Sequence, residues 1–252
     1  MLKKRLIPSL LFNGYSLVKS IQFSNLRILG NPIQAVKVYN AREVDELVFL
    51  DIGATVNNRG PLFDVIHDVA EECFMPLTIG GGIDTLAQIR QILQIGSDKV
   101  ALNSNAFKNP SLIAEAANKF GKQAIVISVD VKRLSSGKYE IRINGGKKST
   151  GMDAVAWCKE IERLGAGEIF LTSIDRDGKM KGYDIELLYS ISKTTAIPVI
   201  ASGGAGKPKD FIRAIKEGNI DAVSAASIFH YTHYTPQMIK QHMASEGIIV
   251  RI

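Results

Sequence analysis

Cysteine is scarce in this sequence, and long apolar runs are missing. The 252 residues include only two cysteines, Cys73 and Cys158, and their spacing resembles no metal or redox motif. We therefore predict two buried, free thiols on helices and a reducing compartment, the cytoplasm. No apolar run comes near the ~18 residues that a membrane crossing needs, so we expect no membrane-spanning segment.

Linkers and clustered ligands are also lacking. The chain has no Ser- or Pro-rich linker, which predicts one domain over residues 1–252. The basic stretch 1–5 runs into Pro8 and then Asn13-Gly14, so we interpret it as leading into a first strand and not as a signal peptide. The four histidines, His67, His230, His233 and His242, show no ligand spacing. We predict no metal and no cofactor.

The charge is positive but dispersed. The net charge is +6 and the isoelectric point is near 9.2. The lysines are spread along the chain without interleaved aromatic residues, so we expect no nucleic-acid partner. An anionic small molecule accounts for this charge equally well.

Short apolar runs alternate with amphipathic ones eight times along the chain. Most of the apolar runs are continuous, as in strands buried on both faces. The predicted strands cover 6–11, 46–52, 76–79, 99–102, 124–129, 168–172, 198–201 and 222–226. The predicted helices cover 32–44, 61–74, 84–95, 109–119, 152–165, 184–194, 207–218 and 236–246. Eight such units predict a (β/α)8 TIM barrel, an α/β fold whose chemistry lies on the loops after the strands.

Two connections are long for a compact domain. Residues 11–31 show no clear periodicity, and a loop of that size is usually functional or disordered. Residues 138–146 alternate and end in Asn144-Gly145-Gly146, which predicts a small hairpin over the mouth of the barrel.

The chain resembles two copies of one half. Residues 76–83 (PLTIGGGI) and 199–206 (VIASGGAG) share a strand-then-glycine plan, and the step from Gly81 to Gly203 is 203 − 81 = 122 residues. This step is close to half of 252, so we predict two similar half-barrels.

Small residues at four strand ends suit phosphate groups. Backbone N–H groups in glycine turns, helped by a hydroxyl or amide, cradle anions. The candidate residues fall in two groups across the barrel mouth, which predicts a ligand with a phosphate at each end. They are Gly81, Gly82, Asn103 and Ser104 in one half, and Gly203, Gly204, Ala226 and Ser227 in the other. The alternative is that these glycines serve packing alone.

Carboxylates at strand tips are candidates for proton transfer or for holding a substrate hydroxyl. Asp130 ends the fifth predicted strand, Asp51 ends the second, and Asp177-Gly178 follow the sixth. The alternative for each is a helix cap or a loop salt bridge. The repeat aligns Asp130 with Leu11, at a step of 130 − 11 = 119, and leucine cannot exchange a proton.

Several motifs together carry a family resemblance over essentially the whole chain. They are VDELVFLDI at 44–52, GGGI at 80–83, DKV at 98–100, LTSIDRDG at 171–178 and ASGGAGK at 201–207. The chain resembles the cyclase subunit of imidazole glycerol phosphate synthase, the HisF family. The resemblance implies a barrel that works with a HisH-like glutaminase, whose ammonia crosses the barrel to react with a bis-phosphorylated intermediate of histidine synthesis.

The resemblance also implies roles for five charged residues. Four of them, Arg5, Glu46, Lys99 and Glu168, match the family's ammonia gate at the barrel bottom. A purely structural ring of salt bridges is the alternative. Lys19 matches a lysine that helps to hold substrate.

The resemblance implies a pair of catalytic aspartates, one of which is Asp130. The sequence departs from the family at the other one. The family's first strand reads Cys-Leu-Asp where this chain has Ser9-Leu10-Leu11. Residues 5–11 are instead similar to the WbuZ subgroup, which occurs with an N-acetyl-sugar amidotransferase in surface-polysaccharide synthesis. Three hypotheses follow: an ammonia-delivering subunit with impaired cyclisation, an authentic histidine-pathway cyclase (a lyase) that uses Asp51, Asp177 or water instead, and a non-catalytic scaffold that activates a glutaminase.

Overall fold

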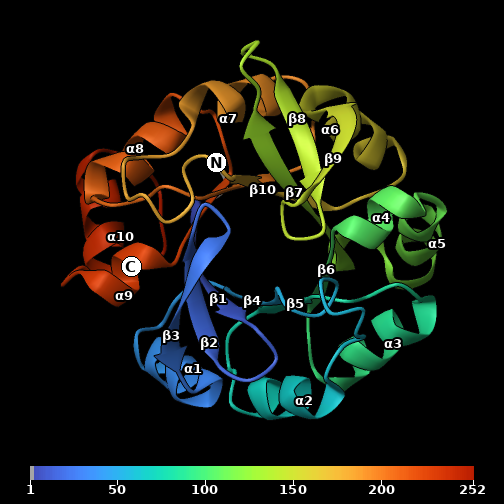
Figure 1. Ribbon diagram of the computed structural model, residues 1–252. Helices are drawn as coiled ribbons and strands as arrows, with labels where there is room; N and C mark the ends of the chain where they lie inside the picture. Colours follow the sequence, from blue (N-terminus) through green and yellow to red (C-terminus); the bar gives the residue numbers. More distant parts are fainter. Residues whose placement is uncertain (1–2) are drawn as a thin grey trace.

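Eight parallel strands form a closed barrel in the computed structural model, which describes residues 3–252. Strand β1 pairs with both β12 and β4, and β7 pairs with β10, so the sheet has no open edge within the barrel. Figure 1 shows the helices surrounding these strands. The barrel strands are β1 (Arg5–Phe12), β4 (Leu47–Asp51), β5 (Leu77–Gly80), β6 (Lys99–Leu102), β7 (Ile125–Arg133), β10 (Glu168–Ser173), β11 (Val199–Ser202) and β12 (Ala222–Ala225). The predicted TIM barrel is confirmed.

The outer helices begin where the sequence supplies caps. Asn31 accepts hydrogen bonds from the first turn of α1, Thr85 and Gln88 form a capping box on α3, and Thr235 caps α10. The long helices are α1 (Pro32–Ala41), α2 (Phe63–Glu71), α3 (Leu86–Ile95), α5 (Ser111–Phe120), α6 (Ala154–Arg163), α7 (Ile185–Ser192), α8 (Pro208–Lys216) and α10 (Pro236–Ser245). A 3₁₀ turn, η1 (Lys122–Ala124), precedes β7.

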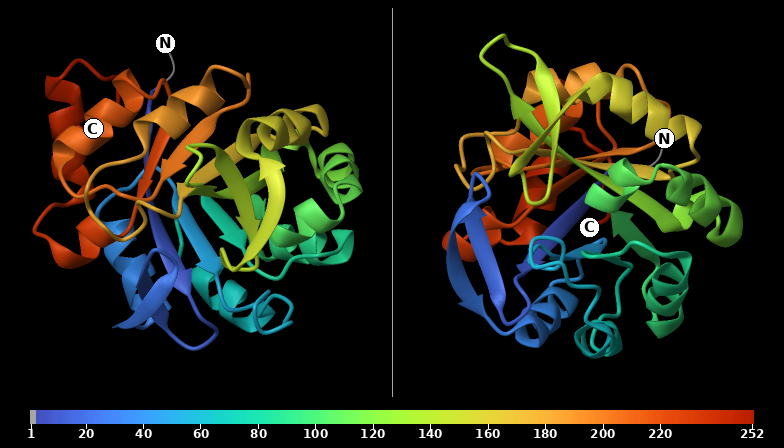
Figure 2. Two further views of the ribbon diagram at one scale, coloured as in Figure 1. Left: turned by 45° about the horizontal axis from the view of Figure 1, so that its top comes forward. Right: turned by 45° about the vertical axis from the view of Figure 1, so that its right-hand side comes forward.

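Two hairpins extend the sheet beyond the barrel at the carboxyl ends of the strands. The first joins β2 (Leu17–Ile21) to β3 (Ser24–Gly30), and the second joins β8 (Tyr139–Ile143) to β9 (Lys148–Asp153). The right-hand view of Figure 2 shows both at the same end of the barrel. The second hairpin agrees with the prediction, whereas residues 11–31 are a hairpin instead of an aperiodic loop.

Several predicted boundaries were wrong for local reasons. Helix α2 begins at Phe63, not at Pro61, and it ends before Cys73, which is only half-buried. Cys158 lies buried on α6 as predicted. Strand β9 extends to Asp153, so α6 begins at Ala154, two residues after the predicted start at 152. Two short helices were missed, α4 (Ser104–Lys108) and α9 (Ser227–Tyr231).

The core has two parts. A large apolar cluster lies between the strands and the helices, and a smaller one fills the barrel interior. The interior cluster is Ile7, Val48, Ala101, Val126, Phe170, Ile200 and Ala222, with Leu50 against it. Among the described residues, no helix is both long and apolar enough to span a membrane.

Candidate functional site

A cavity of about 440 Å³ opens at the carboxyl ends of the barrel strands. Every residue predicted for the barrel mouth lines this cavity. They are Leu11, Lys19, Asp51, Gly81, Gly82, Asn103, Ser104, Asp130, Asp177, Gly178, Gly203, Gly204, Ala226 and Ser227. The structure therefore brings together side chains from both halves of the chain, and their roles stay predictions.

The glycine turns in both halves have backbone angles that favour glycine. Gly81 and Gly204 have φ values of +120° and +118°, and a Cβ on either would lie 2.3 Å from a backbone oxygen, that of Asp51 or Gly182. The close approach shows that packing alone requires glycine there. The same conformation exposes the turns to the cavity, so the two interpretations are compatible.

The two short helices occupy equivalent places in the two halves, each directly after the barrel strand that follows a glycine turn. Helix α4 begins at Ser104 after β6, and α9 begins at Ser227 after β12. Ser104 Oγ accepts a hydrogen bond from the Asn144 N–H at 2.9 Å, which ties the second hairpin to the mouth. The match between the halves agrees with the predicted internal repeat.

Asp130 is the carboxylate with the most perturbed environment in the cavity. Burial raises its pKa to about 7, a hydrogen bond from Asn103 opposes the rise, and the charge of Asp177 adds to it. The Asn103 amide nitrogen donates to Asp130 Oδ2 at 2.8 Å. A carboxyl group with a pKa near 7 can give or take a proton at neutral pH.

Asp177 is tied to the first hairpin. Its carboxylate accepts from Lys19 Nζ at 2.8 Å and from Ser20 Oγ at 3.0 Å, and all three side chains are buried. The backbone N–H of Gln22 also donates to the Asp177 carbonyl oxygen at 3.0 Å. Lys19, predicted to hold substrate, thus lies in the cavity wall as the partner of a carboxylate.

Asp51 organises its own loop. One carboxylate oxygen accepts from the backbone N–H groups of Gly53 and Ala54, at 3.0 and 3.1 Å. The other accepts from Arg59 Nη2 at 2.7 Å. The loop salt bridge that the sequence left open as an alternative is therefore present.

Leu11 lies on β1, beside Leu50 of β4 and Val18 of the first hairpin. Its half-buried side chain lines the same cavity as Asp130. The position that the repeat matches to Asp130 is consequently apolar.

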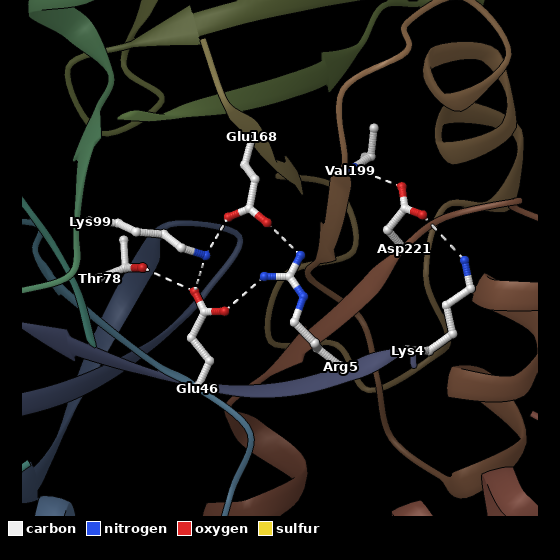
Figure 3. A network of polar contacts seen from close by, with 8 residues as sticks. All are labelled: Lys4, Arg5, Glu46, Thr78, Lys99, Glu168, Val199 and Asp221. Atoms are coloured by element: carbon white, nitrogen blue, oxygen red, sulfur yellow. Dashed lines mark hydrogen bonds and ion pairs between the residues drawn. The ribbon is translucent and has the colours of Figure 1, made fainter. Parts of the chain in front are cut away.

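The four predicted gate residues meet at the opposite end of the barrel (Figure 3). Arg5 donates to Glu46 at 2.8 Å and to Glu168 at 2.5 Å. Lys99 donates to the same two carboxylates, at 3.0 and 2.7 Å. Each cation therefore bridges both anions in a closed ring, and Thr78 Oγ1 adds a hydrogen bond to Glu46 at 3.2 Å.

The sequence alone did not point to the partner of Asp51 or to the hydroxyl residues of the cavity. Arg59, the partner of Asp51, sits on an irregular loop where no pattern marks it. Interior hydroxyl residues such as Ser9 and Ser224 also line the cavity. Counting back two residues at a time from the strand ends would have found the hydroxyls, because side chains two apart share a face of a strand.

Comparison with known proteins places this geometry in a family. The family model described as "Histidine biosynthesis protein" matches residues 5–235. The subunit HisF of imidazole glycerol phosphate synthase from Alkaliphilus metalliredigens (strain QYMF) is 47% identical over 251 residues, covering 100% of both chains. The chain belongs to the HisF family. Among residues 3–252 of this HisF-family chain, no group of three or more His, Cys, Asp or Glu side chains is placed to hold a metal.

Proposed function

We propose that this HisF-family chain is an ammonia-channelling subunit that works with a HisH-like glutaminase. Ammonia enters at the ring of Arg5, Glu46, Lys99 and Glu168 and reaches the upper cavity. There it is used to amidate N-acetyl sugars for surface polysaccharides, together with an N-acetyl-sugar amidotransferase. Cyclisation of the bis-phosphorylated histidine-pathway intermediate is impaired.

The observation that carries this proposal is the set of carboxylates in the cavity. Three carboxylates line the cavity, and two of them are held in ion pairs: Asp51 with Arg59, and Asp177 with Lys19. Of these three, Asp130 alone has no ion-pair partner among residues 3–252, and Leu11 stands at the position that the repeat matches to it. Cyclisation needs one group as the acid and another as the base, and of the three cavity carboxylates in the described chain Asp130 is the one that is free to serve.

A single carboxylate is sufficient for simple amidation. When ammonia adds to an acetamido carbon whose oxygen has been activated by the amidotransferase and its co-substrate, a C–N bond forms, the activated oxygen leaves with its C–O bond, and the positively charged nitrogen releases a proton. Asp130, with a pKa raised to about 7, can accept that proton. The loss of one member of the pair therefore affects cyclisation more than ammonia transfer.

The glycine turns support an anionic ligand at the same cavity. Gly81 and Gly82 face it from one half, and Gly203 and Gly204 face it from the other. Phosphate groups held there would fix the ligand across the mouth, above the barrel interior.

An authentic histidine-pathway cyclase is the second candidate. It is favoured by the 47% identity over the full length of a chain named as a HisF subunit. For this activity, the ion pair of Asp51 or Asp177 must break so that its carboxylate can transfer a proton. Otherwise a water molecule must carry out the proton transfer that Leu11 cannot. A scaffold that only activates a glutaminase is the third candidate, and it predicts no nitrogen transfer.

The test follows nitrogen through the assembled complex. Glutamine labelled with ¹⁵N at the side-chain amide is supplied with excess unlabelled ammonium, the glutaminase and the sugar amidotransferase. We expect ¹⁵N in the amidated sugar, because channelled ammonia does not mix with the solution. Label that is diluted to the level of the bulk ammonium, or that never leaves the glutaminase reaction, would contradict the proposal.

A further inference from the structure

Five hydroxyl side chains line one side of the inner part of the upper cavity, on the neighbouring strands β7, β10, β11, β12 and β1. They come from five barrel strands, and all line the cavity; we call them the hydroxyl collar. The collar consists of Ser9, Ser128, Thr172, Ser202 and Ser224.

The collar follows the apolar interior cluster by a fixed step. Each hydroxyl residue stands two positions after an apolar residue of that cluster on the same strand, and so shares its inward face. The pairs are Ile7 and Ser9, Val126 and Ser128, Phe170 and Thr172, Ile200 and Ser202, and Ala222 and Ser224. On this side of the barrel, the interior is therefore charged at the bottom, then apolar, then lined by hydroxyls; on β4 and at the end of β6 the same level holds Leu50 and Asn103.

Ser224 is the collar residue whose buried hydroxyl lacks a hydrogen-bond partner. Its side chain is fully buried, and its Oγ has no hydrogen-bond partner among residues 3–252. A buried hydroxyl without a partner costs about 1–3 kcal/mol, so native proteins rarely retain one without a reason. Ser224 is among the residues that line the cavity, so a small ligand there is the partner that its buried hydroxyl lacks.

We propose that the hydroxyl collar, with Ser224 as its anchor, is a holding site for neutral ammonia. This rests on the proposed function, in which ammonia reaches the cavity from the ring below. A molecule that crosses the apolar cluster has no hydrogen-bond partners, which is costly for a polar group. The collar is the first place above that cluster where such partners return.

Hydroxyl groups suit ammonia better than a carboxylate would. A serine hydroxyl both donates and accepts, so it bonds the nitrogen lone pair or an N–H without adding charge. A nearby carboxylate favours ammonium, because an opposite charge stabilises the protonated form. Ammonium has no lone pair and cannot attack carbon. Leu11 adds no charge at the mouth, and Asp130, two residues beyond Ser128 on β7, is the carboxyl group that accepts a proton once the ammonia has attacked.

The direct test uses methylamine, an amine large enough to be told from water in a crystal. Crystals of the wild type, Ser224→Ala and Ser224→Thr are soaked above the pKa of the amine. We expect its nitrogen within hydrogen-bond distance of the residue-224 hydroxyl in the wild type and in Ser224→Thr. Loss of that partner should lower its occupancy roughly three- to tenfold in Ser224→Ala.

Ser190→Ala is the matched control, since its hydroxyl bonds the Leu187 carbonyl on α7 and lies outside the cavity lining. Methylamine that binds outside the collar, or equally in wild type and Ser224→Ala, would overturn the holding site. The ¹⁵N transfer assay gives a second readout: Ser224→Ala should release roughly three- to tenfold more labelled ammonium to solution per sugar amidated, and Ser224→Thr should restore retention. A wild type that transfers no ¹⁵N would count against the proposed function, while the methylamine site would still decide the collar.

Discussion

The two ends of the barrel interior hold their charges in opposite ways. At the bottom, Arg5 and Lys99 each bridge Glu46 and Glu168, so every charge has two partners of opposite sign. At the top, Asp130 has an amide as its hydrogen-bond partner, and its pKa is raised to about 7. The ring charges are held in ion pairs, whereas an unpaired buried carboxyl is poised to exchange a proton.

The bottom ring and the glycine turns are complete, whereas the pair of proton-transfer groups at the top is not. The ring has all four of its charged residues, and both sets of glycine turns face the mouth. The position that the repeat matches to Asp130 holds the apolar Leu11. Under the proposed function, we expect this pattern of a subunit that handles ammonia and an anionic ligand without a second proton-transfer group.

Removal of a ring carboxylate should have the largest effect on stability. Glu46→Ala leaves Arg5 and Lys99 each with one partner in a buried setting, and we expect a loss of about 3–5 kcal/mol in the free energy of unfolding. Urea denaturation measures it. Lys4→Ala, which removes the more exposed ion pair with Asp221 beside the ring in Figure 3, should cost less than about 1 kcal/mol. Equal losses would mean that the ring is not a closed, buried network.

A methyl group at Gly178 should have a smaller effect at the opposite end. Its Cβ would lie 2.3 Å from the Ser20 carbonyl oxygen and would push the first hairpin away. Gly137→Ala is the control, because Gly137 also has a positive φ but has nothing within 4 Å of an added Cβ. We expect Gly178→Ala to be less stable than Gly137→Ala by about 1–3 kcal/mol. Similar denaturation midpoints for the two variants would contradict this prediction and show that the hairpin can move away from residue 178 at little cost.

The pH dependence of stability should report Asp130. Between its ordinary value of 3.8 and about 7, the folded protein keeps a proton that the unfolded chain has released. The free energy of unfolding should therefore fall as the pH rises through this range, by at most ~1.4 kcal/mol per pH unit from this group. Denaturation from pH 4 to 8 should show a shallower fall for Asp130→Asn than for the wild type. Parallel curves would place the pKa of Asp130 near its ordinary value.

The barrel and most of its mouth were predictable from local patterns. Continuous apolar runs marked the eight strands, and the carboxyl ends of parallel strands meet at one face. Residues as distant as Gly81 and Gly203 could therefore be assigned to one cavity from the amino-acid sequence alone. The ring followed from the family resemblance together with its position at strand starts.

What the sequence missed depends on distant partners or short elements. The hairpin strand Leu17–Ile21 buries Lys19 and Ser20 against Asp177, which lies far along the chain, so its pattern does not alternate. Helices of five residues, such as α4 and α9, are too short to show a period. The pairing of Asp51 with Arg59 depends on an irregular loop, whose path no local rule gives.

The most direct test of this account is turnover of the bis-phosphorylated histidine-pathway intermediate by the chain alone, with saturating ammonium at alkaline pH. This assay bypasses the glutaminase and the ring, so it isolates proton transfer. We expect almost no turnover by the wild type and by Leu11→Asn, and a gain of roughly 10²–10⁴-fold for Leu11→Asp. Wild-type turnover equal to that of Leu11→Asp would contradict the account and identify the chain as a working cyclase.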